Sequence, residues 1–238
     1  DPALNPGAAE VCDGIDNDCD GVADDDCFAC DLSVPFNYAT IQGAVDALTT
    51  GTVCVGPGTW TGLVDLADKP LRLVGIEGAG RTTLDGDGSG SVVTVGAVPQ
   101  PGAIIEGLTI ENGLADYGAG INIAGGAALL ARLVVRSNVA NVEGGGIFAA
   151  TPESLVMADV DVLGNGGGGI WIEGGAEIDI FRLRVEDSIG TGLSLMGASG
   201  TVRAASLTSN TEGGLVERYT SSPLEFESVL IAGNDRLT

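Results

Sequence analysis

The chain has 238 residues, no histidine and a net charge of −23, which comes from 33 acidic and 10 basic side chains. A surface this acidic argues against nucleic acids and anionic membranes as partners, because contacts with phosphate need Lys and Arg. The lack of histidine excludes Ser-His-Asp triads and most catalytic zinc sites, and no apolar run approaches the ~20 residues that insert into a membrane.

Residues 1–31 are predicted to form an acidic module with ten Asp or Glu and no Lys or Arg. Within CDGIDNDCDGVADDDC, at residues 12–27, the spacing Asp16-x-Asp18-x-Asp20-Gly is that of the first half of an EF-hand calcium loop. Alternate carboxylates in such a loop converge on one hard cation, so we expect a calcium ion to supply the missing positive charge. A solvated acidic linker, a Cys-rich zinc site and a copper site are the alternatives.

The predicted calcium ligands are side-chain carboxylates and one main-chain carbonyl, that of Val22: Asp13, Asp16, Asp18, Asp20, Val22, Asp24 and Asp26. An EF-hand loop has a bidentate Glu at its twelfth position. Cys27 stands at that position in this chain, so Asp26 or Asp25 would have to replace the Glu.

Five cysteines, four of them before residue 31, indicate disulfides and an oxidising compartment, so we expect a secreted protein. We predict a disulfide between Cys30 and Cys54. If Val53 and Val55 point into the first coil, Cys54 faces outward, near the acidic module. One further bridge, 12–19 or 12–27, and one free thiol would come from the remaining cysteines: Cys12, Cys19 and Cys27.

One amphipathic helix is predicted within YATIQGAVDALTT, at residues 38–50, where apolar side chains recur at helical spacing. After Gly51 the helical pattern gives way to short β-type runs separated by glycines. The predicted organisation is therefore an acidic module at 1–31, a linker and helix at 32–51, and a β-structure at 52–238.

The β-type runs repeat. Aligned apolar anchors follow one another at spacings of 25, 27, 23, 22 and 24 residues: Ile110, Val135, Val162, Val185, Leu207 and Ile231. A repeat of this length, made of alternating strands and turns, indicates a solenoid whose stacked coils share one core. The predicted fold class is all-β, a right-handed parallel β-helix of about seven coils with an N-terminal capping helix.

Asparagine occurs three residues after four of the six anchors: Asn138, Asn165, Asn210 and Asn234. Asparagines that stack at one turn position predict a ladder of side-chain amides, and Asn also tolerates the left-handed conformation of a tight bend. The helix is expected to cover the N-terminal end of the solenoid, where open strand edges would otherwise be exposed. No similar cap follows the last coil, which leaves that coil open for self-assembly.

Two stretches of the sequence resemble known families. NYATIQGAVDAL, GTVCVGPGTWTG and LRLVGIEGAGRTTLDG resemble the opening of pectin-lyase-like β-helix proteins, a resemblance that extends over residues 36–238. EVCDGIDNDCDGVADD resembles the CDGxDNDCDGxxDE metal-binding motif of secreted myxobacterial-type surface proteins. The first family contains lyases, hydrolases and esterases, so its fold does not decide activity. The QDT and DFxFG motifs of its methylesterases are absent from this sequence.

Two outward-facing columns of the aligned coils gather charged residues: Arg132, Asp159, Asp161, Arg182 and Arg184. In a catalytic interpretation the aspartates would act as acid and nucleophile, and an arginine would stabilise charge. We favour cross-strand ion pairing, as Arg132–Asp159–Arg182 and Asp161–Arg184, because carboxylates among guanidiniums stay ionised. No catalytic residue is assigned.

A further outward column places Phe148 and Trp171 as exposed neighbours on adjacent coils, with Asn122 on the coil before. Adjacent exposed aromatic rings can stack on sugars or anchor a partner chain. The alternative is that a loop of the same chain covers them.

We therefore expect a secreted, calcium-stabilised β-helical surface protein with a structural, adhesive or assembly role and no enzymatic activity. Its expected partners are a polysaccharide or another surface protein chain. The alternatives are a carbohydrate-active enzyme, either a polysaccharide lyase or a hydrolase, and a carbohydrate-binding module.

Overall fold

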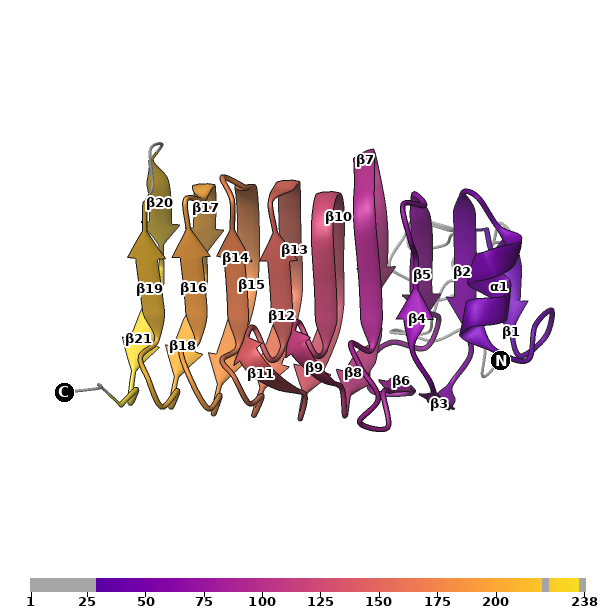
Figure 1. The fold of residues 1–238 in the computed structure, drawn as a ribbon, viewed down its shortest axis with the longest axis horizontal. Coiled ribbons are helices and arrows are strands. Elements are labelled where there is room, and N and C mark those ends of the chain that lie inside the picture. The colour runs from indigo at the N-terminus through magenta and orange to yellow at the C-terminus, as the bar shows by residue number, and fades with distance from the viewer. Residues whose placement is uncertain (1–28, 220–222, 236–238) are drawn as a thin grey trace, which may run out of the picture.

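The computed structural model of the chain describes residues 29–219 and 223–235. Nineteen of its strands hydrogen bond in parallel and wind into a β-solenoid of about eight turns, with a single short helix at the N-terminal end (Figure 1). Within the described residues, no helix is both long and apolar enough to cross a membrane. The predicted all-β parallel solenoid is confirmed.

Each coil contributes strands to three faces of the solenoid. The first face contains β4 (Val64–Asp65), the first part of β7 (Val93–Glu106), the first part of β10 (Ile121–Arg136), β12 (Ile147–Ala150), β14 (Ile170–Glu173), β16 (Leu193–Met196) and β19 (Leu215–Arg218). The second face contains β1 (Leu32–Val34), β2 (Gly51–Val55), β5 (Leu71–Gly75), the second part of β7, the middle of β10, the first parts of β13 (Pro152–Leu163) and β15 (Glu177–Glu186), β17 (Ser199–Arg203) and β20 (Leu224–Glu227).

The third face completes each turn. It contains β3 (Gly58–Thr61), β6 (Thr82–Asp85), β8 (Thr109–Glu111), the last parts of β10, β13 and β15, β18 (Ser206–Thr208) and β21 (Leu230–Ala232). Two further strands, β9 (Leu114–Tyr117) and β11 (Val139–Glu143), pair with each other outside the solenoid sheet.

The predicted anchors form one column of the core. Ile110, Val135 and Val162 pair in register, and each is fully buried. The same column continues toward the N-terminus through Leu84 and Trp60, which the repeat alignment did not include. The solenoid therefore has about eight turns rather than the seven expected.

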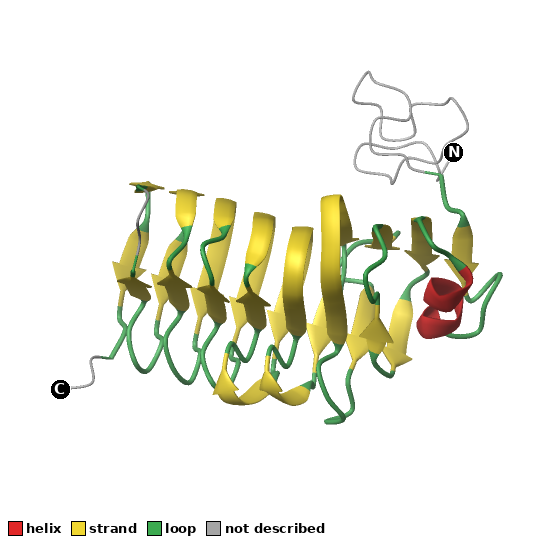
Figure 2. Cartoon of the chain, turned by 45° about the horizontal axis from the view of Figure 1, so that its top comes forward, coloured by secondary structure: helices red, strands yellow, loops and turns green. Residues whose placement is uncertain are grey.

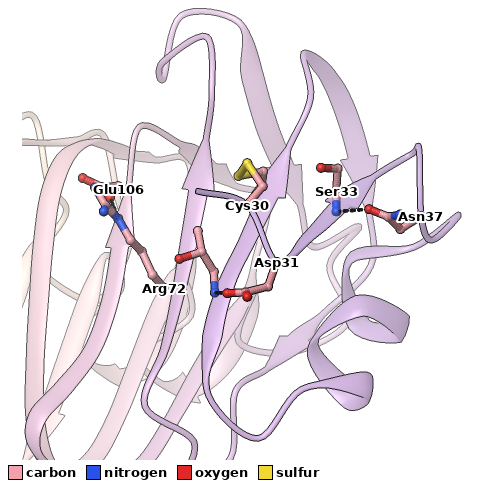
Figure 3. Close-up of a disulfide and its surroundings, with 8 residues drawn as sticks. Cys30, Asp31, Ser33, Asn37, Arg72 and Glu106 are labelled. Atoms are coloured by element: carbon pink, nitrogen blue, oxygen red, sulfur yellow. Dashed lines mark hydrogen bonds and ion pairs between the residues drawn. A yellow bond between two sulfur atoms is a disulfide. The ribbon is translucent and has the colours of Figure 1, made fainter. Parts of the chain in front are cut away.

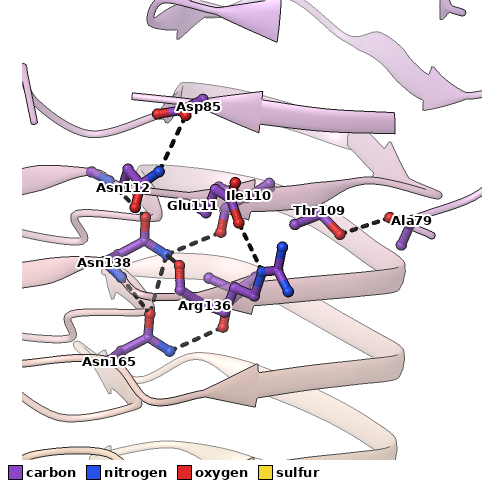
Figure 4. Close-up of polar contacts among 11 residues, drawn as sticks. Ala79, Asp85, Thr109, Ile110, Glu111, Asn112, Arg136, Asn138 and Asn165 are labelled. Carbon is purple, nitrogen blue, oxygen red and sulfur yellow. Dashed lines mark hydrogen bonds and ion pairs between the residues drawn. The ribbon is translucent and has the colours of Figure 1, made fainter. Parts of the chain in front are cut away.

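The asparagine ladder is present, as Figure 4 shows for Asn138 and Asn165, and Asn138, Asn165 and Asn210 are buried. The side-chain oxygen of Asn165 accepts from both the main-chain N–H and the Nδ2 of Asn138, at 3.0 and 3.1 Å. Asn138 Nδ2 also donates to the Ile110 carbonyl at 3.1 Å, and Asn165 Nδ2 donates to the Val135 carbonyl at 3.0 Å. Each amide thus joins its own coil to its neighbours and satisfies groups that would otherwise be buried without a partner.

The left-handed conformation lies one residue earlier than we expected. The ladder asparagines do not have a positive φ; the residue that precedes each of these turn positions does, with φ between 55° and 65°: Ser137, Gly164, Asp187, Ser209 and Gly233. The exposed residue makes the bend, and the next residue then points its amide into the solenoid. Gly146 lies against the amide of Asn165: a Cβ at this position would lie 3.2 Å from Asn165 Nδ2 and 2.6 Å from the Gly169 carbonyl oxygen, so only glycine fits.

The N-terminal end is covered by α1 (Ile41–Ala47), as predicted (Figure 2). The helix is shorter than the predicted segment, because the Thr40 side chain caps its first turn by accepting from the Gly43 N–H and the chain is already extended at Leu48. Apolar side chains of the helix, including Ile41 and Val45, are buried against the first coils. The predicted linker also contains β1, which pairs with β2 and was not anticipated.

The C-terminal coil is open in the described structure. Its anchor Ile231 is 49% exposed, whereas the preceding anchor Leu207 is fully buried. β21 pairs with β18 on one side, and no other described strand pairs with it. Burial of the core therefore depends on having a coil on both sides.

Ser188 interrupts the ladder, and this position provides a test of it. Its hydroxyl is buried and has no hydrogen-bond partner within the described residues, although Ser188 N–H donates to Asn210 Oδ1 at 3.1 Å. A Ser188→Asn substitution should connect Asn165 to Asn210 and raise the free energy of unfolding by about 1 kcal/mol, measured by urea denaturation. Ser188→Ala is the control and should change stability little. A less stable Ser188→Asn variant would contradict the account of the ladder.

Candidate functional site

An open groove with a volume of about 470 Å³ lies along the bend between the second and third faces. Charged side chains from three successive coils line it, as the sequence predicted: Arg132, Asp159, Asp161, Arg182 and Arg184. β10, β13 and β15 supply these residues, which come next to each other because the coils stack in register. The residues at the bend itself adopt positive φ values of 52–56°.

Two of the predicted ion pairs are present in this groove. Two guanidinium nitrogens of Arg182 contact Asp159: Nε donates to Oδ1 and Nη2 donates to Oδ2. Arg184 Nη1 lies 3.8 Å from Asp161 Oδ2, and its Nη2 contacts Glu186 on the same strand. Opposite charges on stacked parallel strands relieve the repulsion that like charges would cause.

The predicted pairing of Arg132 with Asp159 is wrong. Arg132 turns toward the second face and donates to Glu106 at 2.8 Å, and Arg72 contacts the other carboxylate oxygen of Glu106 (Figure 3 shows Arg72 and Glu106). The Glu106 side chain is only 5% exposed, so it requires these two donors. The alignment missed Glu106 because it considered only the two columns that flank the groove.

The electrostatics of the groove favour ionised carboxylates. The bidentate hydrogen bonds from Arg182, together with its charge, hold the pKa of Asp159 below its ordinary value. On the second face, hydrogen bonds from Arg203 and Thr201 lower the pKa of Asp179 in the same way. A carboxyl group that gives up its proton this readily is a poor general acid at neutral pH. The exposed guanidiniums of the groove can instead bind anionic or hydroxyl-rich ligands.

The aromatic column does not form the exposed pair that we expected. Phe148 and Trp171 are neighbours on adjacent coils, but Phe148 is only 8% exposed. The ring of Tyr117 covers it, with the ring centroids 4.9 Å apart, and Asn122 donates to the Tyr117 carbonyl at 3.5 Å. Trp171 is partly buried, and its indole N–H donates to Glu173 at 3.0 Å. The alternative interpretation holds for Phe148, which Tyr117 of β9 covers, whereas Trp171 remains partly exposed.

The predicted disulfide between Cys30 and Cys54 is present (Figure 3). Cys54 faces away from the core formed by Val53 and Val55, yet it is only 1% exposed. Next to it, Asp31 accepts the main-chain N–H of Thr52 at 2.7 Å through its carboxylate. The last residues of the acidic module are thus fixed to the second face of the first coil.

The predicted metal ligands lie outside the described residues, as do the three other cysteines: Asp13, Asp16, Asp18, Asp20, Val22, Asp24, Asp26, Cys12, Cys19 and Cys27. Elsewhere, in the part of the chain that the structure describes, no group of three or more acidic, Cys or His side chains is arranged to hold a metal ion. By its chemistry, the oxygen-rich donor set of residues 13–26 fits a hard cation.

A family model, Cu-binding_MopE, described as "Putative metal-binding motif", matches residues 1–25. A search of curated proteins gives no significant match. Among solved structures, a pectin methylesterase mutant in complex with a hexasaccharide has a TM-score of 0.49 and 12% identity, over 82% of this chain and 68% of that chain. The pectin methylesterase from Aspergillus niger has a TM-score of 0.44 and 16% identity, over 84% of each chain.

The lowered pKa values of Asp159 and Asp179 predict a dependence of stability on pH. Because each group titrates at a lower pH in the folded than in the unfolded chain, its contribution is complete above the unfolded pKa of about 3.9 and is lost as the pH falls below it. The Asp159→Asn, Asp179→Asn double variant should lose less stability than the parent between pH 5 and about pH 3. Thermal denaturation across this range measures the difference. Asp187→Asn, in an exposed turn, should keep the parental slope, and an unchanged slope in the double variant would refute the pairing.

Proposed function

We propose that this chain is part of a secreted surface protein, in which an N-terminal calcium-binding module is attached to a non-enzymatic β-solenoid that serves adhesion or assembly. The observation that carries this proposal is the pairing of acids with arginines in the groove between the second and third faces. Asp159 and Asp161 are each in contact with an arginine, and hydrogen bonds from Arg182 hold Asp159 ionised. Such a surface is suited to stability and binding rather than to proton transfer.

The export of the protein is supported by its cysteines. Disulfides persist in oxidising compartments, and the Cys30–Cys54 bond joins the end of the acidic module to the start of the solenoid. Calcium is the metal we propose because the donors in residues 13–26 are oxygen atoms, and neither Met nor His occurs among them. When bound, the ion would offset the repulsion among these carboxylates.

A carbohydrate-binding role for the groove is a second candidate. The side chains of Arg182 and Arg184 are 53% and 49% exposed, so each guanidinium presents part of its edge to solvent despite its ion pair. The carboxylates of an acidic polysaccharide could replace Asp159 or Asp161 as the acceptors of hydrogen bonds from these guanidiniums. This candidate places the ligand on the solenoid, whereas the calcium site lies on the N-terminal module.

Calcium binding is tested by protection of the N-terminal module. Calcium should protect residues 10–28 from proteolysis, with a dissociation constant on the order of 10⁻⁴–10⁻³ M as in extracellular modules. Chelation should remove this protection and leave the far-UV CD spectrum of the coils unchanged, since the coils have their own core. Asp18→Ala and Asp20→Ala should abolish protection, whereas Asp116→Ala, on the solenoid, should not. Protection by copper but not by calcium would show that calcium is the wrong metal. No protection by either ion would refute the metal site.

The non-enzymatic role predicts no cleavage of uronate polysaccharides. We expect neither unsaturated nor reducing sugar ends from pectin or alginate, and no methanol from methylated pectin. Activity that disappears in Asp159→Ala or Asp161→Ala, while Asp187→Ala retains it, would show instead that the groove is catalytic.

A further inference from the structure

The second face carries apolar side chains on its outer surface as well as on its inner one. Ile105 and Leu130 point into the core and are fully buried. Their neighbours alternate to the outside, where six apolar side chains form what we call the outer strip: Val74, Ile104, Leu129, Ala131, Val156 and Ala158. Val74 and Ala131 are buried, and the other four are partly exposed. The sequence shows the same feature as nearly continuous apolar runs, AIIE and AALLARL.

Parallel strands that read as continuous apolar runs are normally covered on both faces. Farther along, the column of Leu129 and Val156 continues with the polar residues Asp179 and Thr201. The column of Ala131 and Ala158 continues with Phe181, whose ring centroid lies 4.1 Å from the Arg182 guanidinium. The apolar outer surface therefore ends at Phe181, on the coil after Val156. Its extent indicates a covering segment of limited size rather than a partner along the whole solenoid.

Two arginines lie beside the outer strip, and both Arg72 and Arg132 contact Glu106. The Arg132 side chain is 52% exposed, which leaves part of its guanidinium accessible from outside. In a chain with a net charge of −23, this is a place where an acidic segment would meet attraction rather than repulsion.

The N-terminal segment of the chain starts from this surface. Cys30 is bonded to Cys54, and Cys54 stands in the same outward column as Val74, one coil away. From Cys54 to Ala131 is three coils, or about 14 Å at ~4.8 Å per coil. About five extended residues cover that distance.

We propose that residues 1–28 of this chain dock on the outer strip. This segment contains nine Asp or Glu and no Lys or Arg, which complements Arg132, and it carries the apolar side chains of Val11, Ile15 and Phe28. The tether makes docking intramolecular, so its effective concentration is in the millimolar range without a large interface. The metal-binding motif would then be held against the solenoid instead of being carried on a free arm.

Photo-cross-linking in the full-length chain tests this docking. A benzoylphenylalanine at Leu129 should cross-link within one chain to a peptide from residues 1–28, as identified by mass spectrometry. The matched control is the same group at Val134. Val134 lies in the same strand as Leu129 and is half-buried like it, but it faces outward on the third face. Position 134 should give no such product.

Charge variants provide the second arm of the test. Arg132→Gln should lower the cross-link yield from position 129 about twofold to fivefold, the range expected for one exposed ion pair. Arg136→Gln, which removes a guanidinium paired with Glu111 on the third face, should leave the yield unchanged.

Three outcomes would overturn the docking proposal: products that join two chains, which would make a second copy the occupant; equal yields from positions 129 and 134; or no product that contains residues 1–28. Calcium titration of the same protein keeps this test separate from the proposed function. A segment that binds calcium but does not cross-link refutes docking alone, and one that cross-links without binding calcium refutes the metal site alone.

Discussion

The stacking of each coil on the next in a fixed register is the constraint on which the rest of the structure depends. One coil is too thin to bury its own apolar side chains, and Ile231 in the last described coil remains half exposed for this reason. The buried amides of Asn138 and Asn165 fix that register, because each bonds to main-chain and side-chain groups of a neighbouring coil. Side chains from distant parts of the sequence are thereby brought into columns.

These columns determine what the surface can do. The stacking places Asp159 beside Arg182 and Glu106 between Arg72 and Arg132, so charges from separate coils neutralise one another. The outcome is a groove in which Arg182 holds Asp159 ionised, and a strip whose apolar side chains lie close to the disulfide at Cys30.

Features that follow from the repeat could be predicted from the sequence. The anchors, the amide ladder, the capping helix and the Cys30–Cys54 bond all depend on period and alternation, which single-residue patterns reveal. Features that depend on the direction of a single side chain could not be predicted from the sequence. Arg132 pairs with Glu106 instead of Asp159, because its long side chain reaches a column that the alignment treated as separate. Tyr117 covers Phe148 because β9 leaves the solenoid sheet and brings this ring to another column.

Native-state hydrogen exchange tests most directly whether coil-on-coil stacking holds the molecule together. If each coil is stabilised by its neighbours, main-chain amides in β10 and β13 should exchange most slowly. The protection of amides against exchange should then decrease toward β20 and β21. The same gradient should persist after chelation, because the coils do not depend on the N-terminal module. Equal protection in β21 and β10, or a loss of protection throughout the coils when metal is removed, would contradict this account.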